Sequence, residues 1–436
     1  MELQLDGLPG PTNIHGGLSP GNLASQANAG AKAHPRAAAR QCLAKMRAVM
    51  ALGVPQAVLP PLERPDISFL RAAGFAGTDA EVLVAASRED AQLVRHASSS
   101  AFMWTANCAT VIPAADSADH FCHLVPANLT SLPHRSIEAG PRTRMLRHLF
   151  ADGERFVVHD PLPAVSVLAD EGAANHHRVQ GPAGACHLFV HGRTTASAAA
   201  DLPQRFPARQ WQEASAAVAR LGRARAIVHA RQHPAAIDAG AFHNDVVMAG
   251  VADRILVHER ALVDQPQVIA ELERRCGTLR LAEISELELS LEQAVRSYLF
   301  NSQMLDTPTG IVLLAPAESA DGPARAVIDR LKSEGFFART EFIDLRESMM
   351  GGGGPACLRL RVPLDESGLA AVAGGIILDE DKLRRLEQWV DRRYRRDLAL
   401  SDLRDPALIG ECRTALDELT RILDLGKLYR FQGGSV

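Results

Sequence analysis

The sequence predicts an α/β or α+β protein, and two observations support this fold class. Short apolar runs of strand character alternate along the whole chain with longer segments of helical length, as is typical of mixed folds. No low-complexity linker divides the 436 residues, of which 47% are apolar and 22% are charged. A chain of this size and composition can bury a large core. We therefore expect one domain over residues 1–436 rather than two separable domains.

Eight segments are expected to be helices, and the first two carry residues that typically begin or end a helix. Proline suits the first turn of a helix and glycine ends one, which predicts a helix over 35–52, before Gly53. Thr78 or Asp79 would cap a second helix over 78–96. Six more helices are expected, at 141–151, 210–221, 266–276, 324–335, 379–397 and 406–425.

Strands are expected at seven short apolar runs: 156–158, 164–168, 226–229, 254–257, 310–314, 341–343 and 358–362. Residues 1–35 are rich in Gly, Asn, Ser and Ala, and we expect them to form an N-terminal loop segment. No repeat is visible at the residue level. The recurring strand and helix units are still compatible with degenerate modules around one axis.

The overall composition argues against several classes of protein. A net charge of −4 and a pI near 6.5 give no electrostatic basis for binding nucleic acid or an anionic membrane. The seven cysteines are scattered and form no C-x-x-C, as expected of reduced thiols in a cytosol. The first residues lack a basic and an apolar region, so no signal peptide is expected, and no apolar run could span a bilayer. We expect a cytoplasmic globular protein.

Cys357 is the first candidate functional residue. It follows the glycine run 351–354 and precedes the alternating stretch 358–362, so nearly bare backbone approaches a thiol at the start of a strand. The structural alternative is a flexible turn beside a core cysteine. The run also fits G-x-G-x-x-A formally, but a dinucleotide loop must follow a strand and open a helix, and here a strand follows.

A second candidate pair is His243 and Asp245. In an extended segment, residues two apart face the same side, so the two side chains would point into one space. The histidine could act as a general acid or base, and the carboxylate could orient it or hold a cationic substrate. A polar turn that caps the next segment is an equally good interpretation of this motif alone.

A third candidate is Glu171, in the polar stretch 170–178 after the apolar run 165–168. Ligands of open α/β sheets bind at strand ends, which favours an active-site loop here. A solvated turn capped by Asp170 is the structural alternative. Metal binding is the weakest interpretation, because the adjacent His176 and His177 point apart and H-E-x-x-H is absent.

Candidate anion-binding groups are His134, Arg135, Arg209 and the glycine-rich loop 16–25. Arginine captures carboxylates with two parallel hydrogen bonds, and the backbone N–H groups of a glycine loop can also bind anions. A single arginine is more often a solvated surface group, so each of these is weak on its own.

Taken together, the chain resembles the N-succinylarginine dihydrolases, a family of the guanidine-modifying, or pentein, superfamily. The resemblance spans nearly the whole sequence in ordered blocks. They are Gly17-Leu18-Ser19 with Gly21-Asn22, Pro55-Gln56-Ala57-Val58, Trp104-Thr105-Ala106-Asn107, Asp170 to His176, Pro207-Ala208-Arg209-Gln210, Phe242 to Val246, Tyr298 to Gln303, Asp344 to Met349 and Gly352 to Val362.

The resemblance implies a five-module α/β propeller that acts on N-succinylarginine with no metal and no other cofactor. It makes Cys357 the nucleophile, with His243 and Glu171 as catalytic partners, and it implies a homodimer. Substrate contacts are expected at Gly16, Gly17, Leu18, Ser19, Pro20, Gly21, Asn22, Leu23, Ala24, Ser25, Asn107, His134, Arg135, Arg209 and Asp245. The chain departs from the family at Gly351, where a substrate-contacting Asn is usual, and at Pro20, where an aromatic residue is common.

The expected reaction converts N-succinylarginine and two waters into N-succinylornithine, two ammonia and CO2 through a covalent Cys-amidino intermediate. Three alternatives remain at this point. They are an arginine deiminase-like or amidinotransferase-like pentein, a non-catalytic pentein-fold binding protein, and a metal-dependent amidinohydrolase, for which the required Asp/His motifs are absent.

Overall fold

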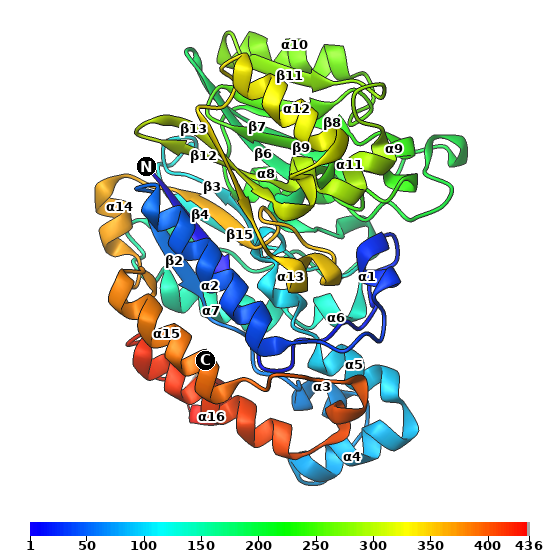
Figure 1. Ribbon diagram of the computed structural model, residues 1–436, viewed down its shortest axis with the longest axis vertical. Helices are drawn as coiled ribbons and strands as arrows, with labels where there is room; N and C mark the ends of the chain where they lie inside the picture. Colours follow the sequence, from blue (N-terminus) through cyan, green and yellow to red (C-terminus); the bar gives the residue numbers. More distant parts are fainter. Residues whose placement is uncertain (434–436) are drawn as a thin grey trace.

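This computed structural model describes residues 1–433 and is built on five three-stranded sheets (Figure 1). All five sheets have the same arrangement of strands. In each sheet the first strand pairs antiparallel with the second, and the second pairs parallel with the third. The sheets are β15 (Arg359–Pro363), β1 (Glu2–Gly7) and β2 (Gln56–Leu59); β3 (Ala109–Ile112), β4 (Cys122–Pro126) and β5 (Phe156–Val158); β6 (His176–Gly181), β7 (Gly184–His191) and β8 (Ile227–Arg231); β9 (Met248–Val251), β10 (Arg254–His258) and β11 (Arg280–Ile284); β12 (Gln303–Thr307), β13 (Gly310–Pro316) and β14 (Arg339–Ile343).

Helices connect the parallel pair of every sheet, because parallel strands need a crossover. The connecting helices are, in sheet order, α1 (Leu23–Ala27) with α2 (Pro35–Ala51), α6 (Pro133–Ser136) with α7 (Ala139–Leu149), α8 (Gln212–Leu221), α10 (Gln265–Cys276) and α12 (Gly322–Ser333). Each module is therefore strand, antiparallel strand, helix and parallel strand. This repetition confirms the expected five-module arrangement.

The remaining helices lie between modules or cover them from outside. They are α3 (Ile67–Ala72), α4 (Asp79–Glu89), α5 (Ala91–Ser98), α9 (Pro234–Asp238), α11 (Leu291–Ser297), α13 (Arg346–Gly351), α14 (Glu366–Ala371), α15 (Glu380–Arg393) and α16 (Ala407–Ile422). In Figure 1, α15 lies between α2 and α16, and α3, α4 and α5 lie together at the lower end.

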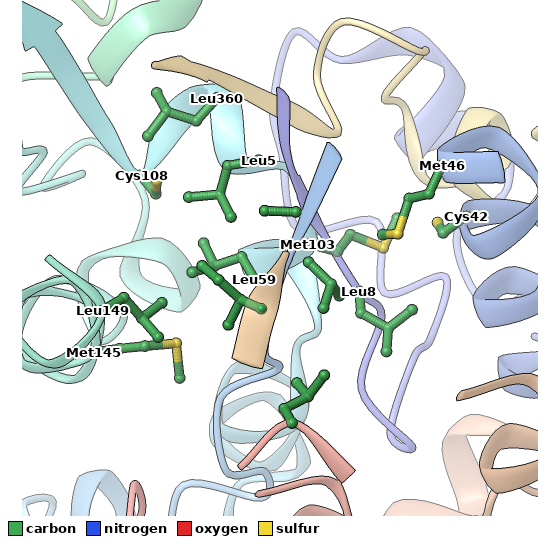
Figure 2. Close-up of a cluster of buried hydrophobic side chains, with 14 of the residues drawn as sticks. Leu5, Leu8, Cys42, Met46, Leu59, Met103, Cys108, Met145, Leu149 and Leu360 are labelled. Carbon is green, nitrogen blue, oxygen red and sulfur yellow. The ribbon is translucent and has the colours of Figure 1, made fainter. Parts of the chain in front are cut away.

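The largest apolar cluster holds the first sheet in place (Figure 2). Met145 and Leu149 of α7 reach the cluster from one side, and Cys42 and Met46 of α2 reach it from the other. Leu360 of β15 is buried in the same cluster, and full burial of one such side chain stabilises the fold by about 1.5–3 kcal/mol. The core thus fixes the strand that begins two residues after Cys357.

Two predicted elements were wrong. The helix expected over 78–96 is two helices, because Asp90 leaves the helical conformation and caps α5 with its side chain. Thr78 does begin α4, in a reciprocal capping box with Glu81. The strand expected over 164–168 is a coil followed by a 3₁₀ turn over Ser166–Leu168. Val165 in it is an exposed large apolar residue, so the run does not belong to the core.

Nine strands lie where no strand was predicted: β1, β2, β3, β4, β6, β7, β9, β11 and β12. β1 falls inside the segment 1–35 that was expected to be a loop, and it pairs with β15 from the other end of the chain. Among the described residues, no helix combines the length and the apolar character needed to cross a bilayer.

Candidate active site

Five short turns bring the candidate residues to one place. Each first strand is preceded by a turn: the 3₁₀ turns Thr105–Asn107, Gly172–Asn175, Asn244–Val246 and Leu299–Asn301, and the turn at 355–358. The first strands of several modules lie next to one another, and residues of all five turns line one central cavity. Residues far apart in sequence therefore meet at equivalent points of repeated modules.

Cys357 lies against Asp245 at this meeting point. Its Sγ is 3.6 Å from Asp245 Oδ2, and both side chains are buried. Burial, followed by the charge of Asp245, raises the pKa of the Cys357 thiol well above its usual value. Burial also raises the pKa of Asp245. In the free protein Cys357 therefore keeps its proton and is a thiol.

His243 pairs with Glu171 beside this thiol. Its Nε2 is 2.9 Å from Glu171 Oε2, and both side chains are buried. Burial acts to raise the pKa of Glu171, but the hydrogen bond and the charge of His243 outweigh it, so the pKa is lowered. Glu171 is therefore an ionised carboxylate that orients the imidazole. The charge of His243 also acts on Asp245, so the two pairs form one electrostatic unit.

Three buried polar atoms of this unit have no hydrogen-bond partner within residues 1–433. They are Glu171 Oε1, His243 Nδ1 and Asp245 Oδ1. An unpaired buried polar atom costs about 1–3 kcal/mol, so a ligand with complementary groups would bind favourably here. Two carboxylate oxygens and one imidazole nitrogen suit a planar cation with several N–H groups.

A cationic region adjoins the acidic one. Arg209 and Arg135 are buried, and Arg209 Nη2 donates to Pro20 O at 2.6 Å. Arg135 Nε donates to Glu138 Oε1 at 2.9 Å, whereas Arg135 Nη2 has no partner within the described chain. Burial and then the charge of Arg135 lower the pKa of His134 well below its usual value, so this imidazole is neutral. This region can accept carboxylates.

Asn107 links the two regions. Its Nδ2 donates to Glu171 O at 2.8 Å, and its Oδ1 accepts from Arg135 Nη1 at 3.2 Å. The side chain thus holds the backbone of the acidic group and the guanidinium of the cationic region at a fixed separation. Its expected role as a substrate contact stays a prediction.

The loop 16–25 closes over the site through two contacts. Asn22 Nδ2 donates to Gly352 O at 2.8 Å, and Pro20 O accepts the hydrogen bond from Arg209. Gly352 has a φ of +98°, and a Cβ there would overlap the Asn22 side chain. Glycine is therefore required at 352 for both backbone conformation and space.

The loop residues divide into two groups. Gly16, Gly17, Leu18, Ser19 and Ser25 line a small cavity of about 30 Å³, together with His134 and Gly351. Leu23, the first residue of α1, instead packs against a separate apolar cluster that includes Val246 and Val295. Position 351 faces Trp104, and a Cβ there would lie 3.0 Å from Cζ2 of its ring.

Two premises about local conformation were wrong, although the residues are close together. His243 and Asp245 do not share an extended segment, because the 3₁₀ turn Asn244–Val246 begins after His243. Glu171 does not follow a strand; it precedes the 3₁₀ turn Gly172–Asn175 that leads into β6. Asp170 does accept from Gly172 N at 3.3 Å, as the capping alternative expected.

Sequence reasoning missed the residues that hold Cys357 and the glycine run. Asn301 Oδ1 accepts from Cys357 N at 3.3 Å, and Asn301 Nδ2 donates to Asp245 O at 3.3 Å. Tyr298 OH donates to Gly352 O at 3.1 Å, and Ser348 Oγ donates to Gly353 O at 2.6 Å. Asn107, Asn175 and Asn301 each end a 3₁₀ turn before a first strand, so an internal alignment of modules could have revealed Asn301.

No group of three or more His, Cys, Asp or Glu side chains within residues 1–433 could hold a metal ion. In particular, His177 bonds to Asn244 Oδ1 at 2.7 Å, and His176 bonds to His187 Nδ1 at 2.9 Å. Both histidines therefore point to different protein partners.

The five repeated modules around a central buried site define a protein of the pentein fold class. Solved structures agree on the fold. The N-terminal domain of ArgZ, an arginine dihydrolase from Cyanobacteria, superposes with a TM-score of 0.53 at 15% identity, over 83% of this chain and 97% of that domain. A mutant of AgrE in complex with L-arginine gives a TM-score of 0.52, also at 15% identity, over 84% of this chain and 41% of AgrE.

Sequence comparison identifies the family. The family model described as Succinylarginine dihydrolase matches residues 1–432. The N-succinylarginine dihydrolases of Pseudomonas syringae pv. syringae and of Myxococcus xanthus are each 48% identical to this chain, over 99% of both sequences. The chain belongs to the succinylarginine dihydrolase family.

Proposed function

We propose that this protein hydrolyses N-succinyl-L-arginine with two waters to N-succinyl-L-ornithine, two ammonia and CO2, as a step in arginine catabolism through succinylated intermediates. One observation carries the proposal: Cys357 contacts Asp245 at 3.6 Å in a buried site that also holds the His243–Glu171 pair. Membership of the family supports the choice of substrate.

The charge distribution of the site fits this substrate. N-Succinylarginine carries a guanidinium at one end and two carboxylates at the other. The unpartnered oxygens of Asp245 and Glu171 would accept N–H groups of the guanidinium and hold its central carbon over the sulfur. Arg209 and Arg135, with the loop 16–25, would bind the carboxylates at the other end.

The first half of the reaction would replace the imino nitrogen by oxygen. The bound cation lowers the pKa of Cys357, the thiol proton would pass to His243 Nδ1, and the thiolate attacks the guanidinium carbon. His243 Nδ1, the ring nitrogen that Glu171 does not contact, would give a proton to the departing ammonia. An amidino-thioether remains, and His243 then removes a proton from the water that hydrolyses it to a ureido compound.

The second half would repeat this cycle on the ureido group. Cys357 attacks its carbonyl carbon, a second ammonia leaves, and a thiocarbamate remains on the sulfur. Water releases the thiol and a carbamate, which loses CO2 to give N-succinylornithine. Over both halves the chain is unchanged and two waters are consumed, and the reaction requires no cofactor.

The proposal extends to the organisation of the protein. The chain would act as a single catalytic domain over 1–436, with residues 1–35 supplying the loop that covers the substrate. It would work as a homodimer in the cytoplasm, without nucleic acid or membrane partners. The net charge of −4 is consistent with this environment.

The test is turnover of N-succinylarginine, with ammonia and both possible products counted. We expect two ammonia for each N-succinylornithine, and no turnover by Cys357→Ser, since a serine hydroxyl is a far poorer nucleophile here. Cys108→Ser is the matched control, because Cys108 is equally buried but lies in the apolar cluster. One ammonia with a ureido product would indicate a deiminase, and activity in Cys357→Ser would refute the covalent mechanism.

A further inference from the structure

A central cavity continues beyond the catalytic residues along the axis of the five modules. It has a volume of about 70 Å³, and Ala106, Asp245 and Ala356 form the end that lies next to Cys357. Residues of β3, β6, β9, β12 and β15 form its wall. A water needs about 10–15 Å³ measured in this way, so several waters fit.

A much larger cavity opens at the far ends of the same strands. Its volume is about 700 Å³, and its lining includes Gln180 at the end of β6, Ala252 after β9 and Asp306 near the end of β12. Arg178 and Arg361 line both cavities. The two cavities therefore adjoin at these arginines, and together, as the axial channel, they extend from Asp245 toward the far ends of the strands.

The wall of the axial channel carries polar atoms that the fold does not use. Ser302 Oγ is buried and has no hydrogen-bond partner within residues 1–433, and Arg359 Nε has none either. By contrast, Arg178 is paired with Asp116, and Arg361 with Glu2. Unpaired polar atoms on the wall of a cavity large enough for several waters indicate that the channel is wet.

The reaction creates a transport problem that such a channel would solve. Each turnover brings in two waters and releases two ammonia and one CO2. The succinylated amino acid to which the reacting group is attached, here called the amino-acid body, must stay bound between the two cycles. The loop 16–25 closes the front of the site through Asn22 and Pro20. Small molecules would otherwise have to pass the bound body and the closed loop.

We propose that the axial channel is a rear conduit, which supplies water to the Cys357 adducts and lets neutral ammonia leave while the amino-acid body remains in front. The proposal rests on the dihydrolase function proposed above.

Charge in the channel favours the neutral form of ammonia. Burial and then the neighbouring Arg361 lower the pKa of Arg359 to about 10, so Arg359 is still cationic at neutral pH. Burial lowers the pKa of His177 to about 4, which leaves this imidazole neutral. One unpaired guanidinium repels ammonium but not ammonia, so the product would not be held beside Asp245 as a cation.

The test narrows the channel without touching the catalytic residues. Ser302→Leu adds bulk at the wall, Ser302→Ala is the matched control that removes the hydroxyl but leaves the space open, and Ala249→Leu narrows the channel from β9. With N-succinylarginine, we measure kcat, KM, the fraction of turnovers that release N-succinylcitrulline, and the unfolding temperature of each protein.

We expect both leucine variants to lower kcat at least tenfold with little change in KM. Ammonia that cannot leave at the rear must wait until the amino-acid body dissociates. After the first cycle this body is N-succinylcitrulline, which should therefore escape into solution. Ser302→Ala should match the wild type within twofold. If Ser302→Leu does not fold, Ala249→Leu decides the test.

Three results would overturn the conduit. They are folded leucine variants with wild-type kcat and product ratio, a loss of activity that appears only as raised KM, and an equal loss in Ser302→Ala. Failure of the wild type to make N-succinylornithine and two ammonia would instead refute the proposed function, so the two failures are distinguishable.

Discussion

Replacement of Asp245 by asparagine should activate the thiol of the free protein and yet abolish turnover. In the structure the carboxylate accepts from Cys357 and raises its pKa. Asp245→Asn removes that negative charge and nearly preserves the shape of the side chain. The thiolate should then form at lower pH, although the guanidinium loses an ionised partner.

The size of the effect follows from the distance. Two unit charges 3.6 Å apart interact by about 4–5 kcal/mol at an effective dielectric constant of about 20. Because burial and the charge of Asp245 raise the pKa of the Cys357 thiol, removal of that charge should lower this pKa, and alkylation should begin at a clearly lower pH than in the wild type. Loss of a buried charged hydrogen bond to the substrate should lower kcat/KM by about 10²–10³-fold.

The assay is the pH dependence of alkylation of Cys357 by iodoacetamide, followed by mass spectrometry of the modified peptide. Cys357→Ser gives the background from the other six thiols. Asp116→Asn makes the same change at a carboxylate that pairs with Arg178 and His187 rather than with Cys357, so it should alkylate like the wild type. An alkylation pKa in Asp245→Asn that equals or exceeds the wild-type value would refute the reasoning.

Four further predictions follow from the site. Glu171→Gln should lower kcat about 10²–10⁴-fold. Because the pKa of Glu171 is lowered in the folded protein, its ionised form stabilises the fold above pH 4.5, and this stabilisation is lost as the pH falls through the folded value. The free energy of unfolding should therefore fall less steeply with decreasing pH in the variant than in the wild type. Gly352→Ala should destabilise the protein by about 1–2 kcal/mol or more and raise KM, measured by denaturation and kinetics, because its φ is positive and Asn22 must move. Arg209→Met should raise KM about 10–100-fold with a smaller change in kcat, since in the proposed complex it would remove a charged hydrogen bond to a substrate carboxylate. Exhaustive chelation should leave the rate unchanged, and any loss that a metal restores would contradict the cysteine mechanism.

The sequence was sufficient to predict the class of fold but not which strands pair with one another. Long amphipathic helices such as α2, α15 and α16 carry periodic apolar positions and end signals, so their places could be predicted. β1 could not, because its six residues lie in a glycine-rich region and its partner β15 is more than 350 residues away. The five-module arrangement came from the family resemblance, since periodicity along the chain does not specify which strands meet.

The candidate site shows the same division between local chemistry and long-range geometry. Cys357 was conspicuous because a glycine run leads to it, and His243 and Asp245 because residues two apart in an extended segment would face the same side. Asn301 carries no such local signal, and only a comparison with the equivalent Asn107 and Asn175 marks it, although it holds both the Cys357 and the Asp245 backbone. Its role depends on two turns from different modules meeting, which only the folded chain reveals.

The raised pKa of Asp245 fits a reaction that handles two different functional groups in turn. A guanidinium is cationic, so it stabilises the ionised carboxylate and lowers the pKa of Cys357 by charge. The ureido group of the second cycle is neutral and cannot do this. Asp245, whose carboxylate is 3.6 Å from the sulfur and whose pKa burial raises, can take the thiol proton itself. Once protonated, it could donate a hydrogen bond to the ureido oxygen, so in the proposed reaction one buried carboxyl group would serve as acceptor in the first cycle and as donor in the second.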